Sequence, residues 1–339
     1  VSMPTYKPTL NYNKKQLKRA MEAISNAKKP LLYIGGGAIL SNCGYEIRDL
    51  AKKLNIPAVE TLMARGVMGD ENPLFFGMLG MHGEYAANMA AHETDLLISL
   101  GARFDDRVTG RLDEFASKAK VIHIDIDPTS IAKLVVADYP IVGDLKLTVE
   151  AMIEDSENYD INDFSNWVEL LKDYREKEPL RYIDTDDLIK PQWPIQRVGK
   201  ILGDNAIIST DVGQHQMWTA QFFPFSHPRQ WITSGGLGTM GFGLPAALGA
   251  ARAFKGTNRV VVNFTGDGSI LMNIQELMTC SEYELPVINI VLNNNYLGMV
   301  RQWQTMFYEN RLAETDLSAQ PKFKMLAEAF NCLGYTVST

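Results

Sequence analysis

Residues 260–269 read VVVNFTGDGS, and this stretch decides the fold class of the chain. Its first five residues are apolar apart from Asn263, which is typical of a strand buried on both faces of a parallel sheet. Gly-Asp-Gly then ends the strand, and apolar residues at helical spacing follow from Ile270 to Met278. The stretch therefore predicts a strand, a tight turn and a helix, the repeating unit of a doubly wound α/β fold.

Residues 286–296 read PVINIVLNNNY and repeat this pattern, with an apolar strand that ends in polar residues. Neighbouring parallel strands end at the same edge of a sheet, so Asp267 should lie close to the asparagine run 293–295. Carboxylate and carboxamide oxygens suit Mg²⁺, which usually keeps phosphate oxygens among its other ligands. Backbone N–H groups at a helix start suit the phosphate itself. The two motifs together predict a magnesium and phosphate site, whereas each alone could be an ordinary turn or loop.

The composition of the chain excludes several classes of protein. Its 339 residues suggest two domains, and 46% hydrophobic with 22% charged residues are ordinary for a globular protein. A net charge of −7 without a basic cluster argues against nucleic-acid binding. The three cysteines fit no disulfide or metal spacing, which favours a reducing compartment. No apolar run is long enough for a membrane span, so we expect a cytoplasmic protein of bacterial type without a membrane partner; an organelle address before residue 1 stays open.

The first domain is expected at residues 12–150, after a linker at residues 1–11. Its helical and apolar segments alternate, which predicts a doubly wound parallel sheet with ligands at the carboxyl ends of the strands. Gly35 and Gly37 match the first two glycines of a dinucleotide-binding fingerprint, but Leu40 replaces the third, so a nicotinamide site is a weak prediction. The expected strands are residues 31–34, 57–59, 96–100, 121–124 and 141–142, and the expected helices include residues 17–27 and 45–54.

The second domain is expected at residues 191–339, after an acidic surface connector at residues 151–190. Three of its strand ends carry glycine-rich or polar turns, as a diphosphate-binding site requires. Residues 334–338 predict the start of a further strand, and both ends of the sequence suggest a piece of a longer polypeptide. The remaining expected elements are strands at 206–210 and 231–233 and helices at 195–202 and 245–250.

Five motifs resemble one known family. Gly-Asp-Gly precedes the asparagine pair by the spacing of thiamine diphosphate enzymes, since Asn294 follows Asp267 by 27 positions. The other motifs narrow the resemblance to the acetohydroxyacid synthase (acetolactate synthase) large subunit, over nearly the whole chain. They are SGGLGTMG at 234–241, GQHQMW at 213–218, LGMVRQW at 297–303 and GARFDDRVTG at 101–110.

The resemblance implies that the second domain binds thiamine diphosphate and Mg²⁺. It assigns Asp267, Asn294 and the backbone carbonyl of Tyr296 to the metal, with Asn293 open as the alternative to Asn294. It also implies that Met240 keeps the cofactor bent, although an isolated methionine is more often a core residue. The other implied cofactor contacts are Val212, Gly213, Gln214, His215, Gly238, Gly268, Ser269, Leu297, Gly298 and Met299.

For the first domain the resemblance implies FAD without a net redox role. Glycines would let the backbone approach its pyrophosphate, arginines would balance its charge, and carboxylates would accept from ribose hydroxyls. The implied contacts are Gly35, Gly37, Thr61, Leu62, Met63, Leu79, Gly80, Met81, His82, Gly101, Arg103, Asp105, Arg107, Asp125, Ile126, Gly143 and Asp144.

The implied reaction is decarboxylation of pyruvate and transfer of the two-carbon unit to a second 2-keto acid, the first common step of branched-chain amino acid synthesis. Pyruvate as acceptor would give 2-acetolactate, and 2-ketobutyrate would give 2-aceto-2-hydroxybutyrate. Arg107 would hold the acceptor carboxylate and Trp303 would select the acceptor, although Asp105 and Arg107 could form a surface ion pair and Trp303 could anchor a helix. The family implies a dimer or tetramer of catalytic subunits and a regulatory small subunit.

One departure from the family concerns activation. The family activates its cofactor with a glutamate on an N-terminal pyrimidine-binding domain, and nothing in this sequence corresponds to that domain. We therefore expect the chain to be nearly inactive by itself. A related FAD and thiamine diphosphate enzyme of the pyruvate oxidase or glyoxylate carboligase type, or a non-catalytic cofactor-binding fragment, are the alternatives.

Overall fold

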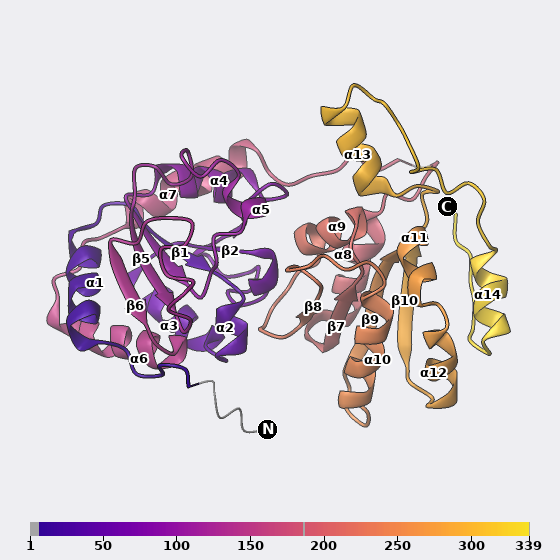
Figure 1. The fold of residues 1–339 in the computed structure, drawn as a ribbon, viewed down its shortest axis with the longest axis horizontal. Helices are drawn as coiled ribbons and strands as arrows, with labels where there is room; N and C mark the ends of the chain where they lie inside the picture. The colour runs from indigo at the N-terminus through magenta and orange to yellow at the C-terminus, as the bar shows by residue number, and fades with distance from the viewer. Residues whose placement is uncertain (1–6, 186, 339) are drawn as a thin grey trace. The chain divides into compact units, whose positions relative to one another are not determined.

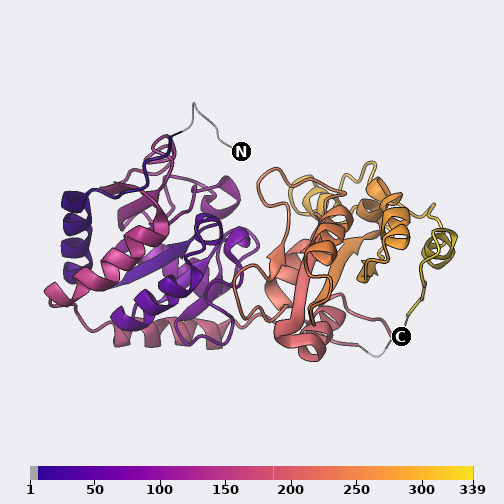
Figure 2. The same ribbon diagram turned by 90° about the horizontal axis from the view of Figure 1, so that it is seen from below.

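The computed structural model describes residues 7–185 and 187–338, which form two units. The first unit runs up to Arg181 and includes the short stretch Ser226–Pro228, and the second unit holds the rest. Each unit is built on one sheet flanked by helices (Figures 1 and 2). Residues 1–6 of the predicted linker, residue 186 of the predicted connector and residue 339 lie outside the described residues.

The first unit contains a six-stranded sheet in the order β3-β2-β1-β4-β5-β6, and all its strand pairs are parallel. The sequence predicted every one of these strands except β3, which reads FFGM and contains Gly77 at a φ of 101°. A glycine at positive φ weakens the pattern by which a strand is recognised. The strands are β1 (Pro30–Ile34), β2 (Ala58–Glu60), β3 (Phe75–Met78), β4 (Leu96–Leu100), β5 (Lys120–Asp125) and β6 (Tyr139–Val142).

The helices of the first unit bury apolar faces against this sheet. The helix at 165–177 belongs to this core, because Trp167 and Leu171 are buried and the Trp167 indole donates to the Pro30 carbonyl at 3.0 Å. This differs from the surface connector predicted for residues 151–190. The helices are α1 (Lys14–Asn26), α2 (Gly37–Leu40), α3 (Gly44–Leu54), α4 (Tyr85–Glu93), α5 (Asp106–Thr109), α6 (Leu145–Asp155) and α7 (Ser165–Lys177), with 3-10 turns η1 (Leu62–Ala64) and η2 (Ser156–Asn158).

The second unit contains a four-stranded parallel sheet in the order β10-β9-β7-β8. Its strands agree with the predicted ones and are β7 (Ala206–Thr210), β8 (Trp231–Ile232), β9 (Val260–Gly266) and β10 (Val287–Leu292). Its helices are α8 (Gln192–Leu202), α9 (Gln214–Phe222), α10 (Gly243–Ala253), α11 (Asp267–Ile270), α12 (Glu276–Glu282), α13 (Gly298–Phe307) and α14 (Phe323–Ala329), with 3-10 turns η3 (Gly203–Asn205) and η4 (Leu271–Asn273).

Two local predictions in the second unit were wrong. The continuous helix expected after Ser269 is divided into α11, η4 and α12, and at the division the Asn273 side chain donates to the Gly241 carbonyl at 2.8 Å. Residues 334–338 do not form the expected strand, since a strand requires a hydrogen-bonded neighbour and none of the described residues pairs with them in this way.

The predicted fold class, α/β with parallel sheets in both domains, is confirmed. In each sheet the strand order reverses direction once, between β1 and β4 in the first unit and between β7 and β9 in the second. Ligands of such folds bind outside the carboxyl ends of the strands at this switch point. Within the described part of the chain, every helix is too short or too polar to cross a membrane.

Candidate functional site

A cavity lies at the switch point of the second sheet, where β7, β9 and β10 end. The space that its lining surrounds, open solvent included, is about 580 Å³. Most of the lining residues come from the ends of the three strands, the turns after them and the first turns of α9, α11 and α13; Trp218 lies one turn further along α9, and Met240 lies in the loop before α10. They are Val212, Gly213, Gln214, His215, Trp218, Met240, Gly266, Asp267, Gly268, Ser269, Leu292, Asn294, Tyr296, Leu297, Gly298, Met299 and Val300.

Most side chains predicted for thiamine diphosphate and the metal therefore line one cavity. Gly238 is an exception: it lies in the loop between β8 and α10 at a φ of 64°, with the Val212 side chain as its neighbour. Trp303 lies further along α13, and its ring contacts Phe307 at a centroid distance of 5.4 Å. The sequence reading missed Trp218, which lies one helical turn after Gln214 on α9, so helical spacing could have found it. It also missed Gly266, Leu292 and Val300.

The Gly-Asp-Gly turn is held by its own hydroxyl and amide groups. The Ser269 hydroxyl accepts from the Gly266 N–H at 3.2 Å, and the Gly268 N–H donates to Asp267 Oδ1 at 3.1 Å. A Cβ at Gly268 would lie 2.8 Å from the side chains of Leu297 and Leu317. A larger residue at this position would therefore push these two leucine side chains away from the turn.

A chain of buried hydrogen bonds runs beneath the turn, from the end of β7 to β9 and α11. Asp211 is fully buried and accepts from the Gly243 N–H at 3.1 Å and from the Thr265 hydroxyl at 2.8 Å. Since the Thr265 proton is directed to Asp211, the Thr265 oxygen accepts from the Ser269 hydroxyl at 3.1 Å. Asp211 thereby fixes the orientation of Ser269 from behind the cavity, a role for which the sequence carried no signal.

His215 lines the cavity with an unsatisfied nitrogen. The residue is only 7% exposed, and burial lowers the pKa of its imidazole to about 3, so the ring is neutral. Its Nε2 is buried and has no hydrogen-bond partner within residues 7–185 and 187–338. A buried polar atom without a partner is costly, and the residue that carries this one is among those that line the cavity.

The atoms with which the predicted metal ligands could bind a cation are oxygens. Asp267 Oδ2 accepts from the Gln320 side chain, and Asn294 Oδ1 accepts from the Tyr296 N–H at 3.0 Å. Asn294 is among the lining residues and Asn293 is not. The described residues contain no cluster of three His, Cys, Asp or Glu side chains for a metal, so a cation here would need amide and carbonyl oxygens. That donor set fits a hard ion such as Mg²⁺.

The residues predicted for FAD gather at the carboxyl edge of the first sheet. The turns after β1 and β4 touch closely at its switch point: a Cβ at Gly35 would lie 2.3 Å from the Gly101 carbonyl oxygen, and one at Gly37 would lie 2.7 Å from Gly101 Cα. Close packing of two turns thus explains these glycines in part. Arg103 and Arg107 are exposed, each with a carboxylate oxygen of a neighbouring aspartate at 3.4 Å.

The other predicted FAD residues follow the remaining strands of that sheet. Thr61, Leu62 and Met63 follow β2, and Leu79, Gly80, Met81 and His82 follow β3. Three of the predicted carboxylates also have local structural roles. Asp105 caps α5, and Asp144 caps α6 by accepting from the Leu147 N–H at 3.0 Å. Asp125 accepts from the Asp127 N–H at 2.9 Å. Ile126 follows β5, and Gly143 packs against the backbone of Tyr12.

Comparison with known proteins identifies both units. The family model described as "Thiamine pyrophosphate enzyme, central domain" matches residues 17–152, and "Thiamine pyrophosphate enzyme, C-terminal TPP binding domain" matches residues 211–339. The chain is 46% identical over its whole length to the acetolactate synthase isozyme 3 large subunit of Escherichia coli (strain K12) and covers 59% of that protein. It is 45% identical, again over its whole length, to the acetolactate synthase large subunit of Haemophilus influenzae, of which it also covers 59%. For the acetolactate synthase of Mycobacterium bovis the identity is 45%, over 98% of this chain and 55% of the relative.

Proposed function

The chain belongs to the thiamine pyrophosphate enzymes as a homologue of the acetolactate synthase large subunits, and on that basis we propose that it contributes to the condensation of pyruvate with a second 2-keto acid. The first pyruvate loses CO₂, and its remaining two-carbon unit is joined to the acceptor: the products are 2-acetolactate and CO₂ from two pyruvates, and 2-aceto-2-hydroxybutyrate and CO₂ from pyruvate and 2-ketobutyrate. The observation that carries the proposal is the cavity that Asp267, Asn294 and His215 line together, with His215 Nε2 buried and without a hydrogen-bond partner among the described residues.

In this proposal the cavity holds the diphosphate end of the cofactor and its Mg²⁺. Asp267, Asn294 and the Tyr296 carbonyl ligate the metal, and His215 and Ser269 contact the diphosphate. When bound, thiamine diphosphate supplies the electron sink for decarboxylation. Met240, whose flexible apolar side chain lines the cavity, supports the cofactor rings. Asp211 holds Ser269 in place through Thr265.

FAD in a non-redox role is the second part of the proposal. Its support is the strand order of the first sheet, which is the order of dinucleotide-binding folds, and the exposed guanidinium groups of Arg103 and Arg107 at its carboxyl edge. A guanidinium can bind a carboxylate through a forked pair of hydrogen bonds. Arg107 is accordingly the candidate for the acceptor carboxylate, and Trp303, on the helix whose first turn lines the cavity, is the candidate for acceptor selection.

The proposed assembly is a homo-oligomer of catalytic subunits with a regulatory small subunit, acting on free 2-keto acids in the cytoplasm. The proposed domains are residues 12–150 for FAD and residues 191–339 for thiamine diphosphate. Because the chain spans 59% of the length of its Escherichia coli relative, the activity is proposed for the whole protein and not for residues 1–339 in isolation.

The test is acetolactate formation from pyruvate with thiamine diphosphate, Mg²⁺ and FAD. Residues 1–339 are assayed alone and after addition of the N-terminal part of the Escherichia coli relative that they do not match. We expect activity only after the addition, and none with Asp267→Ala in either case. Activity of residues 1–339 alone would show that a base within this chain activates the cofactor. Flavin reduction during turnover would instead indicate an oxidase.

A further inference from the structure

The segment after β2 is buried but almost without regular secondary structure. Beyond η1 (Leu62–Ala64) the chain passes through residues 65–69 with every residue buried. Gly66 has a φ of 91°, which places it in the region that favours glycine. Buried peptide groups outside helices and sheets need partners from elsewhere, so what holds this segment decides its shape.

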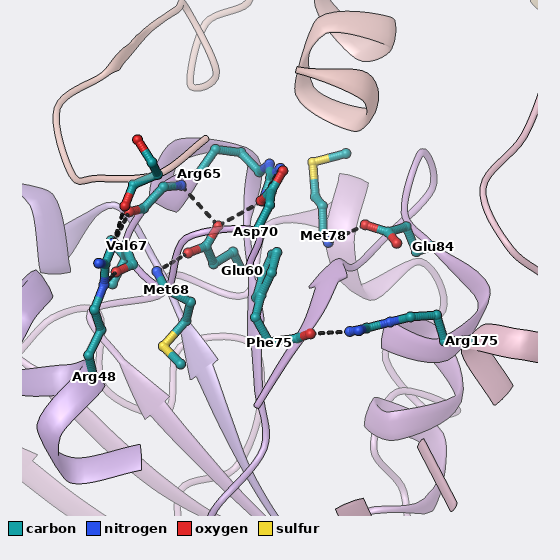
Figure 3. A network of polar contacts seen from close by, with 12 residues as sticks. Arg48, Glu60, Arg65, Val67, Met68, Asp70, Phe75, Met78, Glu84 and Arg175 are labelled. Carbon is teal, nitrogen blue, oxygen red and sulfur yellow. Dashed lines mark hydrogen bonds and ion pairs between the residues drawn. The ribbon is translucent and has the colours of Figure 1, made fainter. Parts of the chain in front are cut away.

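Two side chains of opposite charge hold its peptide groups (Figure 3). Glu60, the last residue of β2, accepts from the Gly66 N–H at 3.1 Å and from the Met68 N–H at 2.5 Å. Arg48 of α3 donates to the Gly66 carbonyl at 2.9 Å and to the Val67 carbonyl at 2.5 Å. The carboxylate thus binds the N–H groups and the guanidinium binds the carbonyls of the same short segment.

Further charges surround this pair. Arg65, 2% exposed, donates to Glu60 at 3.0 Å and to Asp70 at 2.8 Å. Glu84 accepts from the Met78 N–H at 3.3 Å, and Arg175 donates to the Phe75 carbonyl (Figure 3). Burial raises the pKa of Glu60 to about 7, whereas Arg65 and the Met68 and Gly66 N–H groups act to lower it. These three partners of the Glu60 carboxylate are all donors, which is the environment of an ionised carboxylate.

Stability alone is a poor reason for this arrangement. A buried ion pair contributes little net stability, because removing two charges from water costs about as much as their attraction returns. A better account is that charges with several fixed donors specify one geometry. That geometry includes η1. The Thr61 N–H, just before η1, donates to the Ile34 carbonyl of β1 at 2.9 Å. η1 also lies close to the turn after β1, because a Cβ at Gly36 would lie 3.0 Å from Met63 Cβ.

We propose that Glu60 and Arg48 are positioning residues that fix the ligand-facing turn at residues 61–63 by holding the peptide groups of residues 66–68 from opposite sides. The ligand class is a flavin dinucleotide, so this inference rests on the proposed function of the first unit. Neither residue touches the ligand; each acts through the backbone of the turn.

The experiment compares wild type, Glu60→Gln and Glu93→Gln by amide hydrogen exchange of residues 61–70 and by FAD affinity from flavin fluorescence. Glu93 is the matched control, because it is a paired carboxylate of the same unit, 2.7 Å from Lys29, and Lys29 precedes β1 at the opposite edge of the sheet. We expect Glu60→Gln to speed exchange of the Gly66 and Met68 amides at least tenfold and to weaken FAD binding at least tenfold. Glu93→Gln should change neither, and thiamine diphosphate affinity of the second unit should be the same in all three proteins.

The outcomes separate the inference from the proposed function. If wild type binds FAD and Glu60→Gln binds it with the same affinity, the inference is overturned. If wild type does not bind FAD, the flavin part of the proposed function fails. The amide exchange rates then decide alone whether Glu60 and Arg48 hold the turn. Equal rates in wild type and Glu60→Gln would overturn the inference. Arg48→Lys gives the same comparison from the carbonyl side if Glu60→Gln does not fold, although Arg48 also donates to the Ser226 carbonyl at 2.8 Å.

Discussion

Gly298→Ala should weaken binding of thiamine diphosphate and Mg²⁺ while leaving the fold intact. Gly298 is the first residue of α13, and a Cβ there would lie 2.1 Å from Gln214 Oε1 and 2.7 Å from Asn294 Nδ2. Both atoms are at the ends of flexible side chains, so the side chains rotate away and the backbone stays. Rotation breaks the Gln214–Gln302 hydrogen bond of 3.0 Å and moves Asn294 from the predicted metal site.

The magnitude follows from the two displaced groups. Each hydrogen bond or ligand bond that the cofactor or metal no longer receives costs about 0.5–1.5 kcal/mol, so two cost about 1–3 kcal/mol. That corresponds to roughly a 5- to 150-fold higher Kd. Alanine is also a better helix former than glycine by up to about 1 kcal/mol, which offsets the side-chain rearrangement. The free energy of unfolding should therefore change by less than about 1 kcal/mol.

The assay is titration of residues 1–339 with thiamine diphosphate at fixed Mg²⁺, followed by isothermal calorimetry and by the fluorescence of Trp218, which lines the cavity. Gly249→Ala is the matched control, because a Cβ at that exposed helical position has no atom of the described residues within 4 Å. It should stabilise the chain by about 0.5–1 kcal/mol without changing the Kd. A folded Gly298→Ala protein with the Kd of wild type would refute the assignment of Gln214 and Asn294 to the cofactor site.

Three further changes have definite expected results. Gln320→Ala should tighten Mg²⁺ binding several-fold, because the Gln320 amide now bonds an oxygen of Asp267 that the metal needs; unchanged affinity by calorimetry would argue against Asp267 as a ligand. Asp211→Asn should lower the free energy of unfolding by about 1–3 kcal/mol, because the single amide oxygen cannot take the place of both carboxylate oxygens, one of which accepts from the Gly243 N–H and the other from the Thr265 hydroxyl. It should also weaken cofactor binding. Ser209→Ala is the control: it removes a hydrogen bond of 2.9 Å to the Gly243 carbonyl and should lower the free energy of unfolding without changing the affinity for the cofactor. If both variants change that affinity equally, the Asp211–Thr265–Ser269 hydrogen bonds do not contribute to cofactor binding. Burial lowers the pKa of His215 to about 3 from an unfolded value of about 6.5, so between these values the unfolded chain binds a proton that the folded chain does not. The contribution of neutral His215 to the free energy of unfolding is therefore fully present above pH 6.5 and is lost as the pH falls. The free energy measured by urea unfolding should decrease by about 2 kcal/mol between pH 7.5 and pH 5. If His215→Asn shows the same decrease, His215 is not its cause.

The sequence by itself determined where most of the strands lie along the chain and which turn motifs follow them. A strand such as β9 is encoded by adjacent apolar residues, and the Gly-Asp-Gly turn by residues next to one another, so both are legible without knowing the rest of the fold. The resemblance to the thiamine diphosphate enzymes rested on the same local motifs, and the family matches bear it out. Where the local signal was weak, as in β3 with Gly77, the sequence reading missed the element.

Only the tertiary structure decided which residues distant in sequence meet. Asn293 and Asn294 are equivalent as neighbours on a strand end, and the folded path of the chain turns Asn294 into the cavity. Asp211 reaches Ser269 through Thr265, and Glu60 and Arg48 meet on one segment from different elements. The apolar face of α7 could belong to a surface connector or to a core until its contacts with the first sheet were known. Hydrogen-bond pairing and burial depend on groups that the chain brings together only on folding, and no local pattern of residues carries that information.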